Sequence, residues 1–286
     1  MLANRSFRGW WVRAWLLGPL LLSGASPLRA DSIEVFEPAP EGVDARTVAV
    51  RAANSLRGDR TYIEAEMTTL SPRVSKPRVV SFQSWDDRVE NRALIRILAP
   101  GEDAGSAFLK LQPNLWGFLS REERTLRIQP SMMLQPWMGS GFTNDDLFDP
   151  MSAIENYHHT LLGVDPNPEG TKGVRAYVVE YLPRETASAV WGRILGWIET
   201  EHSTPIRQEF YDDNGANLRT IRFGGVRKVD DRRIPHVWTV TTHGKKNRRT
   251  TIEIRELRFD EHFDDDIFSP RNLKAWNHSA AFEESP

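Results

Sequence analysis

The side chains that could act as catalytic nucleophiles in this chain are limited to serine and threonine, because the sequence contains no cysteine. No serine lies in a Gly-x-Ser-x-Gly elbow, and there is neither a phosphate-binding glycine-rich loop nor a His-x-x-x-His pair. A lipid hydrolase would need a buried hydroxyl beside His158, His202 or His236. The sequence predicts a protein that is not an enzyme.

Groups that could bind a metal or transfer protons occur in patterns that favour structural roles. His158 and His159 are adjacent, and adjacent residues on a strand point to opposite faces, so they are poorly placed to bind one ion. Asp145-Asp146 and Asp264-Asp265-Asp266 would need a carboxyl of raised pKa for acid–base catalysis. Each run directly precedes Leu or Ile and then Phe, where carboxylates stabilise the start of a helix. We predict helix caps, no metal site and no cofactor.

The elements that must position these residues are mainly β-strands. In residues 61–67, Ile63, Ala65 and Met67 alternate with more polar residues, which is the period of a strand. The same period recurs between short Pro, Gly or polar breaks, at residues 79–85, 93–98, 107–111, 115–119, 125–128, 157–162, 174–182, 190–199, 205–211, 218–223, 234–242 and 250–259. This order predicts antiparallel hairpins in a strongly curved sheet, an open barrel or a sandwich, and excludes a doubly wound parallel fold.

Residues 43–56 depart from this pattern, because Val48, Ala52 and Leu56 recur with a roughly helical period. Asp44 favours the start of a helix and Gly58 favours its end. The sequence therefore predicts one helix before the first strand.

A long apolar segment, residues 130–150, interrupts the strands. Its apolar side chains would expose considerable surface in water, so they must cover something or be covered themselves: Met132, Met133, Leu134, Trp137, Met138 and Phe142. Two interpretations remain open, a plug of an ordinary core and a mobile lid over a ligand cavity. Thr143 and Asp146 have the spacing of a capping box, which predicts a short helix at residues 144–147.

Several short motifs carry a resemblance to a known family through their order and spacing. They are Phe108-Leu109-Lys110-Leu111, Asn114-Leu115-Trp116-Gly117-Phe118-Leu119, residues 138–147 (MGSGFTNDDL), Trp197-Ile198-Glu199, Pro205-Ile206, Gln208-Glu209-Phe210-Tyr211, and the ending 263–273 with Asp266-Ile267-Phe268 and Asn272-Leu273. Together they span most of the chain beyond residue 30. The chain resembles the outer-membrane lipoprotein-sorting (LolA-like) family.

The resemblance implies a mainly β fold, a half-open barrel of about eleven antiparallel strands with an N-terminal helix and a helical lid. Its concave apolar face would hold lipoprotein acyl chains or another lipid. The residues that would line the cavity are Ile63, Ala65, Met67, Phe82, Ile95, Leu109, Leu111, Trp116 and Phe118, with Met132, Met133, Leu134, Trp137, Met138 and Phe142 in the lid. A one-residue error in a strand would invert its face.

The chain departs from the classical lipoprotein chaperone in being longer and in having a Trp-rich middle. Members with this pattern resemble proteins that accompany resistance-nodulation-division (RND) type lipid exporters, so lipoprotein, hopanoid and phospholipid all remain candidate cargoes. We expect a carrier that passes cargo toward the outer membrane, with an inner-membrane exporter as partner. The alternative is a periplasmic sensor of envelope stress that uses the same fold.

The first thirty residues predict export. Arg5, Arg8 and Arg13 precede an apolar run at residues 14–22, which ends in small residues up to Ala30. The run is shorter than the roughly 20 residues that span a bilayer, which is typical of a signal peptide cleaved after Ala30; an uncleaved anchor is the alternative. We expect one lipid-binding domain over residues 31–286, located in the periplasm of a Gram-negative bacterium.

Two further features limit the modifications and the kinds of partner that we expect. Without cysteine the chain has no lipobox, so it cannot be acylated at its N-terminus, and it has no disulfides. The formal net charge is −2, and the basic run Lys245, Lys246, Arg248 and Arg249 beside Gly244 is typical of a solvated hairpin turn. Nucleic acid is therefore not an expected partner.

Overall fold

The computed structural model describes residues 36–72, 76–185, 191–244 and 248–274, so the predicted signal peptide, Lys245 and Lys246 lie outside the described residues. Every predicted strand is confirmed, with shifts of a few residues at the ends. The strands are β1 (Arg60–Leu70), β2 (Arg78–Asp87), β3 (Arg92–Ala99), β4 (Ala107–Leu111), β5 (Asn114–Leu119), β6 (Arg124–Ile128), β7 (Tyr157–Asp165), β8 (Ala176–Pro183), β9 (Arg193–Glu199), β10 (Pro205–Tyr211), β11 (Asn217–Val229), β12 (Arg232–Thr242) and β13 (Arg248–Phe259).

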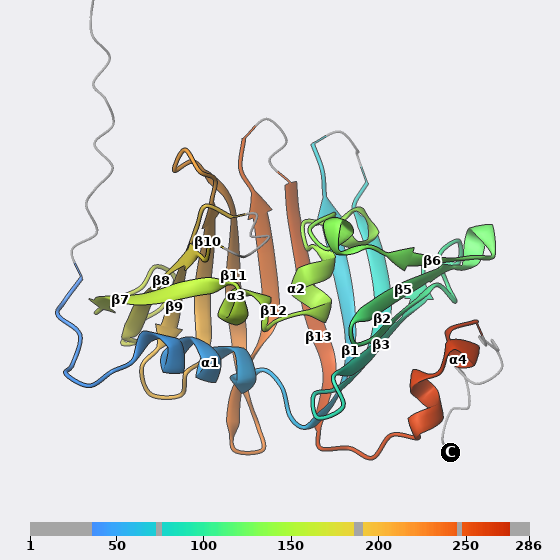
Figure 1. Cartoon of the computed structure of the whole chain (residues 1–286), viewed down its shortest axis with the longest axis horizontal. Helices are drawn as coiled ribbons and strands as arrows, with labels where there is room; N and C mark the ends of the chain where they lie inside the picture. The colour runs from blue at the N-terminus through green and yellow to red at the C-terminus, as the bar shows by residue number, and fades with distance from the viewer. Residues whose placement is uncertain (1–35, 73–75, 186–190, 245–247, 275–286) are drawn as a thin grey trace, which may run out of the picture. The chain divides into compact units, whose positions relative to one another are not determined.

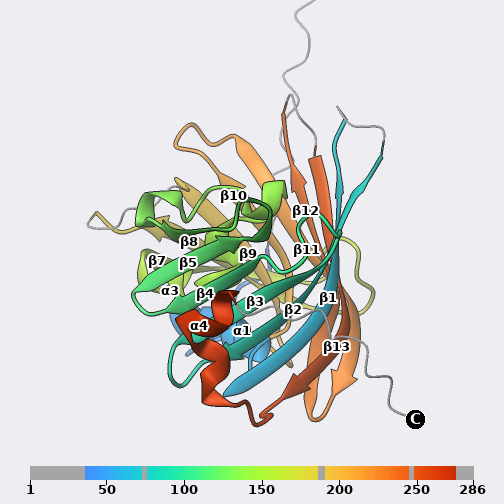
Figure 2. The same ribbon diagram turned by 90° about the vertical axis from the view of Figure 1, so that its right-hand side faces the viewer.

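The strands of the described residues form one antiparallel sheet in the order β6-β5-β4-β3-β2-β1-β13-β12-β11-β10-β9-β8-β7. The chain thus begins the sheet in its middle, builds outward to β6, crosses to β7 and returns strand by strand until β13 pairs with β1. The edge strands β6 and β7 do not pair, so the curved sheet stays open (Figure 1, Figure 2). The predicted half-open barrel is confirmed, with thirteen strands rather than about eleven.

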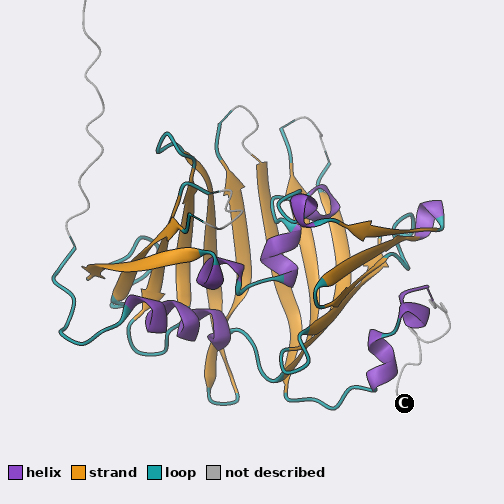
Figure 3. Cartoon of the chain, in the orientation of Figure 1, coloured by secondary structure: helices purple, strands orange, loops and turns teal. Residues whose placement is uncertain are grey.

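One face of the sheet, called the concave face here, carries helix α1 (Ala45–Ser55) (Figure 3). Asp44 caps this helix by accepting hydrogen bonds from the backbone N–H and the hydroxyl of Thr47, each at 2.7 Å. Ala49 and Ala52 are buried, and α1 packs mainly on β7, β8 and β9. The predicted N-terminal helix is confirmed, and its small side chains leave free volume above the sheet.

The segment that joins β6 to β7, residues 129–156, also crosses the concave face, and we call it the lid. It contains η2 (Pro130–Met132), η3 (Trp137–Gly139), α2 (Asn144–Phe148) and α3 (Ser152–Glu155). Thr143 caps α2, and Asp146 returns the hydrogen bond to the Thr143 backbone, so the predicted capping box is confirmed. The lid lies very close to the sheet at Gly141, where a Cβ atom would approach Val240 to 3.0 Å.

The opposite, convex face is covered at one end by the C-terminal segment. Asp264 caps η4 (Asp265–Phe268), which leads into α4 (Pro270–Lys274), as the acidic run predicts. Phe263, Phe268 and Leu273 pack against buried residues of β3 and β4, so both faces of these strands are buried. In the described part of the chain, no helix has the length and apolar character to cross a membrane.

Candidate ligand-binding cavity

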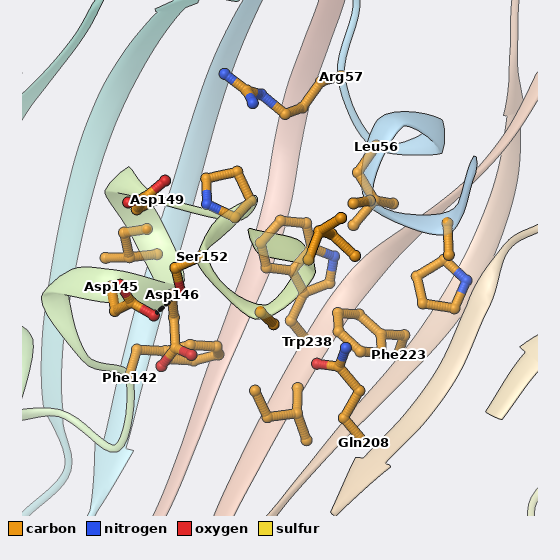
Figure 4. A pocket seen from close by; sticks show the side chains of 18 of the residues that line it. Leu56, Arg57, Phe142, Asp145, Asp146, Asp149, Ser152, Gln208, Phe223 and Trp238 are labelled. Carbon is orange, nitrogen blue, oxygen red and sulfur yellow. Dashed lines mark hydrogen bonds between the residues drawn. The ribbon is translucent and has the colours of Figure 1, made fainter. Parts of the chain in front are cut away.

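A cavity of about 380 Å³ lies between the concave face, α1 and the lid (Figure 4). This volume falls in the usual range of small-molecule sites, roughly 300–1,000 Å³. Most side chains in its wall are apolar, contributed by α1, by the lid and by strands from β1 to β3 and from β8 to β13. The arrangement can shield an apolar molecule from water.

Six predicted site residues line this cavity together. Ile63, Phe82 and Ile95 project from the neighbouring strands β1, β2 and β3, and Met133, Leu134 and Phe142 face them from the lid. Another five predicted residues lie on the same side but pack in the surrounding core instead: Ala65, Met67, Met132, Trp137 and Met138. The lid is thus partly a core plug and partly a cavity wall, so both interpretations of the apolar segment describe a part of it.

The structure corrects the faces predicted for β4 and β5. Leu109, Leu111, Trp116 and Phe118 lie on the convex face, where they pack with the C-terminal segment. They do not line the cavity. Lys110 faces inward instead, and because neighbouring strand residues alternate, Leu109 and Leu111 face the convex side.

Lys110 points inward because the lid offers its ammonium group a partner. The residue is only 9% exposed, and its Nζ donates a hydrogen bond of 2.7 Å to the carbonyl of Phe148 at the end of α2. Burial lowers the pKa of Lys110, against the opposing effect of Asp149. No feature of the strand sequence itself signals this inward charge.

Sequence reasoning missed the half of the cavity that α1 and the later strands build. Ala49, Ala52, Ala53 and Leu56 line it from α1, and Tyr181, Gln208, Arg219, Ile221, Phe223 and Trp238 line it from the sheet. The alternation within β10 and β11 was a usable signal, because Gln208 and Phe210 share one face, as do Arg219, Ile221 and Phe223.

Arg219 joins the sheet to the lid. Its guanidinium donates two hydrogen bonds of 2.7 Å to the carboxylate of Asp146 on α2, and it is only 3% exposed. It lies over the rings of Phe210 and Trp191, at 4.0 and 4.8 Å from their centroids. Burial raises the pKa of Asp146, but the charge and hydrogen bonds of Arg219 outweigh this and hold that pKa below its usual value.

Two other arginines hold the lid backbone from the far end of the sheet. Arg78 on β2 donates a hydrogen bond to the carbonyl of Met138, and Arg248 on β13 donates one of 2.9 Å to the carbonyl of Gly139. Both acceptors lie in η3. The closed lid is therefore fastened by polar contacts at two separate places.

Asp145 is a carboxylate of the cavity wall whose surroundings disfavour its ionised form. Burial raises its pKa to about 6, the charges of Asp149 and Asp146 act in the same direction, and a 2.5 Å hydrogen bond from the Ser152 hydroxyl opposes them (Figure 4). Because the unfolded pKa is about 3.9, ionised Asp145 destabilises the folded chain at neutral pH.

We predict that Asp145→Asn stabilises the protein at pH 7 by about 2 kcal/mol. The wild-type free energy of unfolding should rise as the pH falls from 7 to 5, since the folded state binds the extra proton, and the variant should lose that part of the rise. Urea denaturation at several pH values measures both. Asp213→Asn is the matched control, because Asp213 is exposed and does not line the cavity. An unchanged pH profile in Asp145→Asn would contradict the prediction.

The three histidines considered for hydrolysis contact groups other than serine and threonine hydroxyls where their hydrogen bonds are described. Within the described ranges, no hydrogen bond joins His158, His202 or His236 to such a hydroxyl; His202 contacts Glu199, and His236 contacts the carbonyl of Ile234. A hydroxyl–imidazole pair does occur between Thr220 and His243, at 2.9 Å. Neither residue lines the cavity.

The comparisons with known proteins agree with this geometry. A protein-family model described only as "Uncharacterized protein" matches residues 89–275, more than half of the chain. The solved structure of a DUF1329 family protein from Desulfovibrio piger is similar, with a TM-score of 0.69, 21% identity, and coverage of 80% of this chain and 97% of that one.

Two further structures bear the family description itself. A domain from Vibrio parahaemolyticus described as an outer membrane lipoprotein-sorting protein has a TM-score of 0.68 and 23% identity, and the match covers 81% of this chain and 98% of that one. A LolA superfamily protein from Nitrosomonas europaea has a TM-score of 0.65 and 18% identity, with coverage of 80% and 99%. The chain has the LolA-like fold.

At these identities the likeness to the LolA-like structures shows a shared fold. No curated protein matches the chain in sequence. The cavity between sheet, helix and lid is therefore the feature of this LolA-like chain from which its function must be argued.

Proposed function

We propose that the chain is a periplasmic lipid carrier, which takes up an apolar ligand in its cavity and passes it toward the outer membrane. The observation that carries this proposal is the cavity itself, enclosed by apolar side chains and covered by a lid that polar contacts fasten. The LolA-like fold supports it.

The energetics require no covalent step. Burying apolar surface stabilises an acyl chain by about 0.8 kcal/mol per CH₂, and the same free energy prevents a free acyl chain from crossing water. The protein lowers this barrier by covering the chain. Transfer then follows a gradient of affinity from donor to carrier to acceptor.

The gate in this mechanism is the lid. Opening it must break the ion pair between Arg219 and Asp146 and the hydrogen bonds from Arg78 and Arg248 to η3. A ligand or partner opens the lid only if it binds the open state better than the closed one. A protein that delivers cargo to the carrier or receives cargo from it would have to break these contacts.

The sequence supports the location and the partner that we propose. The basic, apolar and small-residue order of the first thirty residues supports export to the periplasm by a cleaved signal, and the absence of cysteine supports an unlipidated mature chain. The resemblance to proteins that accompany RND-type exporters supports an inner-membrane exporter as the donor of cargo.

Native mass spectrometry of the protein purified from its own periplasm tests the proposal. We expect a stoichiometric apolar ligand, which organic extraction then identifies as a lipid or an acylated protein. An empty protein that also fails to take up a fluorescent fatty-acid probe would overturn carriage. A stable complex with a membrane signalling protein would favour the sensor instead.

A cavity-filling variant gives a second test. Ala53 on α1 lines the cavity, so Ala53→Trp should fill part of it and lower the affinity for a fluorescent fatty-acid probe by at least about tenfold. Arg51→Trp adds the same ring on the exposed side of α1 and should bind the probe like wild type. Titrations of both variants measure this, and equal binding would show that the probe does not enter the cavity.

A further inference from the structure

The part of the cavity wall formed by β8 to β11 carries two polar side chains without a partner. The Tyr181 hydroxyl and the Gln208 side-chain amide make no hydrogen bond to any described residue, and both residues line the cavity. Tyr181 is 3% exposed, and Gln208 is half-buried. Polar groups in such surroundings are normally hydrogen-bonded, so this part of the wall has room for a hydrogen-bonding occupant.

The strand register gathers these groups. Gln208 on β10 pairs with Gly196 on β9, and a Cβ atom built on Gly196 would lie 3.5 Å from the Tyr181 hydroxyl oxygen. The tyrosine ring therefore lies over the glycine, which brings its hydroxyl to the strand position beside Gln208. On the other side, Arg219 pairs with Phe210, which makes it a diagonal neighbour of Gln208 on the same face.

Aromatic rings surround Tyr181 and Gln208, which we call the polar spot. Trp191 and Phe210 form an edge contact at 5.2 Å between centroids, and Phe223 and Trp238 form another at 5.8 Å. Gln208, Phe223 and Trp238 all line the cavity (Figure 4). A ligand that reaches this region would be apolar along its length and polar at one point.

The charges of the neighbouring side chains determine which chemical group can bind at the polar spot. Asp146 already neutralises Arg219 through two hydrogen bonds, and burial raises the pKa of Tyr181, so its hydroxyl stays uncharged. The spot thus offers uncharged hydrogen-bond donors, and among the described residues no unpaired positive charge lies there for a carboxylate or phosphate. Hydrogen-bond donors of this kind suit an uncharged oxygen.

We propose that the cavity selects a lipid that carries an uncharged oxygen, a hydroxyl or an ester carbonyl, on an otherwise apolar body. The Tyr181 hydroxyl and the Gln208 amide bind that oxygen. This inference rests on the proposed carrier function and specifies the class of its cargo. The oxygen can come from a glyceride-like ester or from a long-chain or polycyclic alcohol.

Ligands of one chain length test the inference on the purified protein. Tetradecane, 1-tetradecanol, methyl myristate and myristate each displace bound diphenylhexatriene, a fluorescent hydrocarbon. We expect the alcohol or the ester to bind at least about tenfold more tightly than the hydrocarbon and no less tightly than the carboxylate. The tighter of the two identifies the source of the oxygen.

Two substitutions test whether the polar spot causes the preference for an oxygenated ligand. Gln208→Leu and Tyr181→Phe should each weaken the preferred oxygenated ligand by about tenfold and leave tetradecane unchanged. Gln83→Leu and Tyr211→Phe are matched controls, because these side chains bond Glu64 and Glu209 and do not line the cavity. They should bind every ligand like wild type.

The outcomes separate the two proposals. Equal affinity of wild type for the hydrocarbon and the oxygenated ligands, or a carboxylate at least tenfold tighter than both, would overturn the inference while carriage stands. This comparison needs no variant, so it holds even if a substitution impairs folding. Failure of diphenylhexatriene and all four ligands to bind would overturn the carrier function itself.

Discussion

Replacing Arg219 by methionine is expected to lower the free energy of unfolding by about 3–5 kcal/mol, because the substitution leaves the carboxylate of Asp146 without its charged partner. Only 15% of the Asp146 side chain is exposed, so water replaces the guanidinium poorly. The variant should also release a bound probe faster, since the same ion pair holds α2 against β11. Urea denaturation and probe dissociation kinetics measure the two effects.

The double variant Asp146→Asn with Arg219→Met separates two contributions to the loss of stability, the unpaired carboxylate and the lost packing. It should regain most of the stability, because removing both charges eliminates the unpaired carboxylate. Arg222→Met is the matched control, since it lies on the same strand and pairs with Glu169 at the exposed surface. That change should cost at most about 1 kcal/mol. A double variant as unstable as Arg219→Met would refute the electrostatic account.

Replacing Trp137 by alanine is the other change of large expected effect, about 3–5 kcal/mol. Trp137 is 1% exposed, and its ring lies between Phe82 and Phe108, at 5.5 Å from each centroid. Its removal leaves a void under the lid and detaches η3 from β2 and β4. Hydrogen exchange should therefore accelerate in residues 129–156 well before it changes in the central strands.

Trp116→Ala provides the comparison for Trp137→Ala. Trp116 is half-buried on the convex face, so its loss should cost less and leave exchange of the lid unchanged. If both tryptophan variants accelerate exchange in the lid equally, Trp137 does not act as its anchor.

The strands and caps could be predicted because their causes are local. Alternation within a strand, proline and glycine breaks between strands, and the Thr143–Asp146 spacing depend on neighbouring residues alone. The same is true of Asp44 and Asp264, each of which caps the element that directly follows it. Alternation alone left a strongly curved sheet, an open barrel and a sandwich as possible folds. The resemblance to the LolA-like family then favoured the open barrel.

The faces of β4 and β5 and much of the cavity depend on contacts between distant residues. Lys110 faces inward because it meets the carbonyl of Phe148, and Arg219 faces inward because it meets Asp146, which is 73 residues away. A period-two pattern cannot show that a charged side chain has such a partner. Strands buried on both faces give no polar side from which to orient them.

The position of β1 in the middle of the sheet has a consequence for how the chain folds. Most neighbouring strands are consecutive and can pair as local hairpins, whereas β1 must wait for β13, with Thr61 opposite Phe259. This non-local pairing is expected to set the folding rate. If the chain emerges from an export channel N-terminus first, the edge of β1 stays open until the last strand arrives. An open strand edge of eleven residues is a template for aggregation, so a chain exported in this way would need protection at that edge until its final strand is delivered.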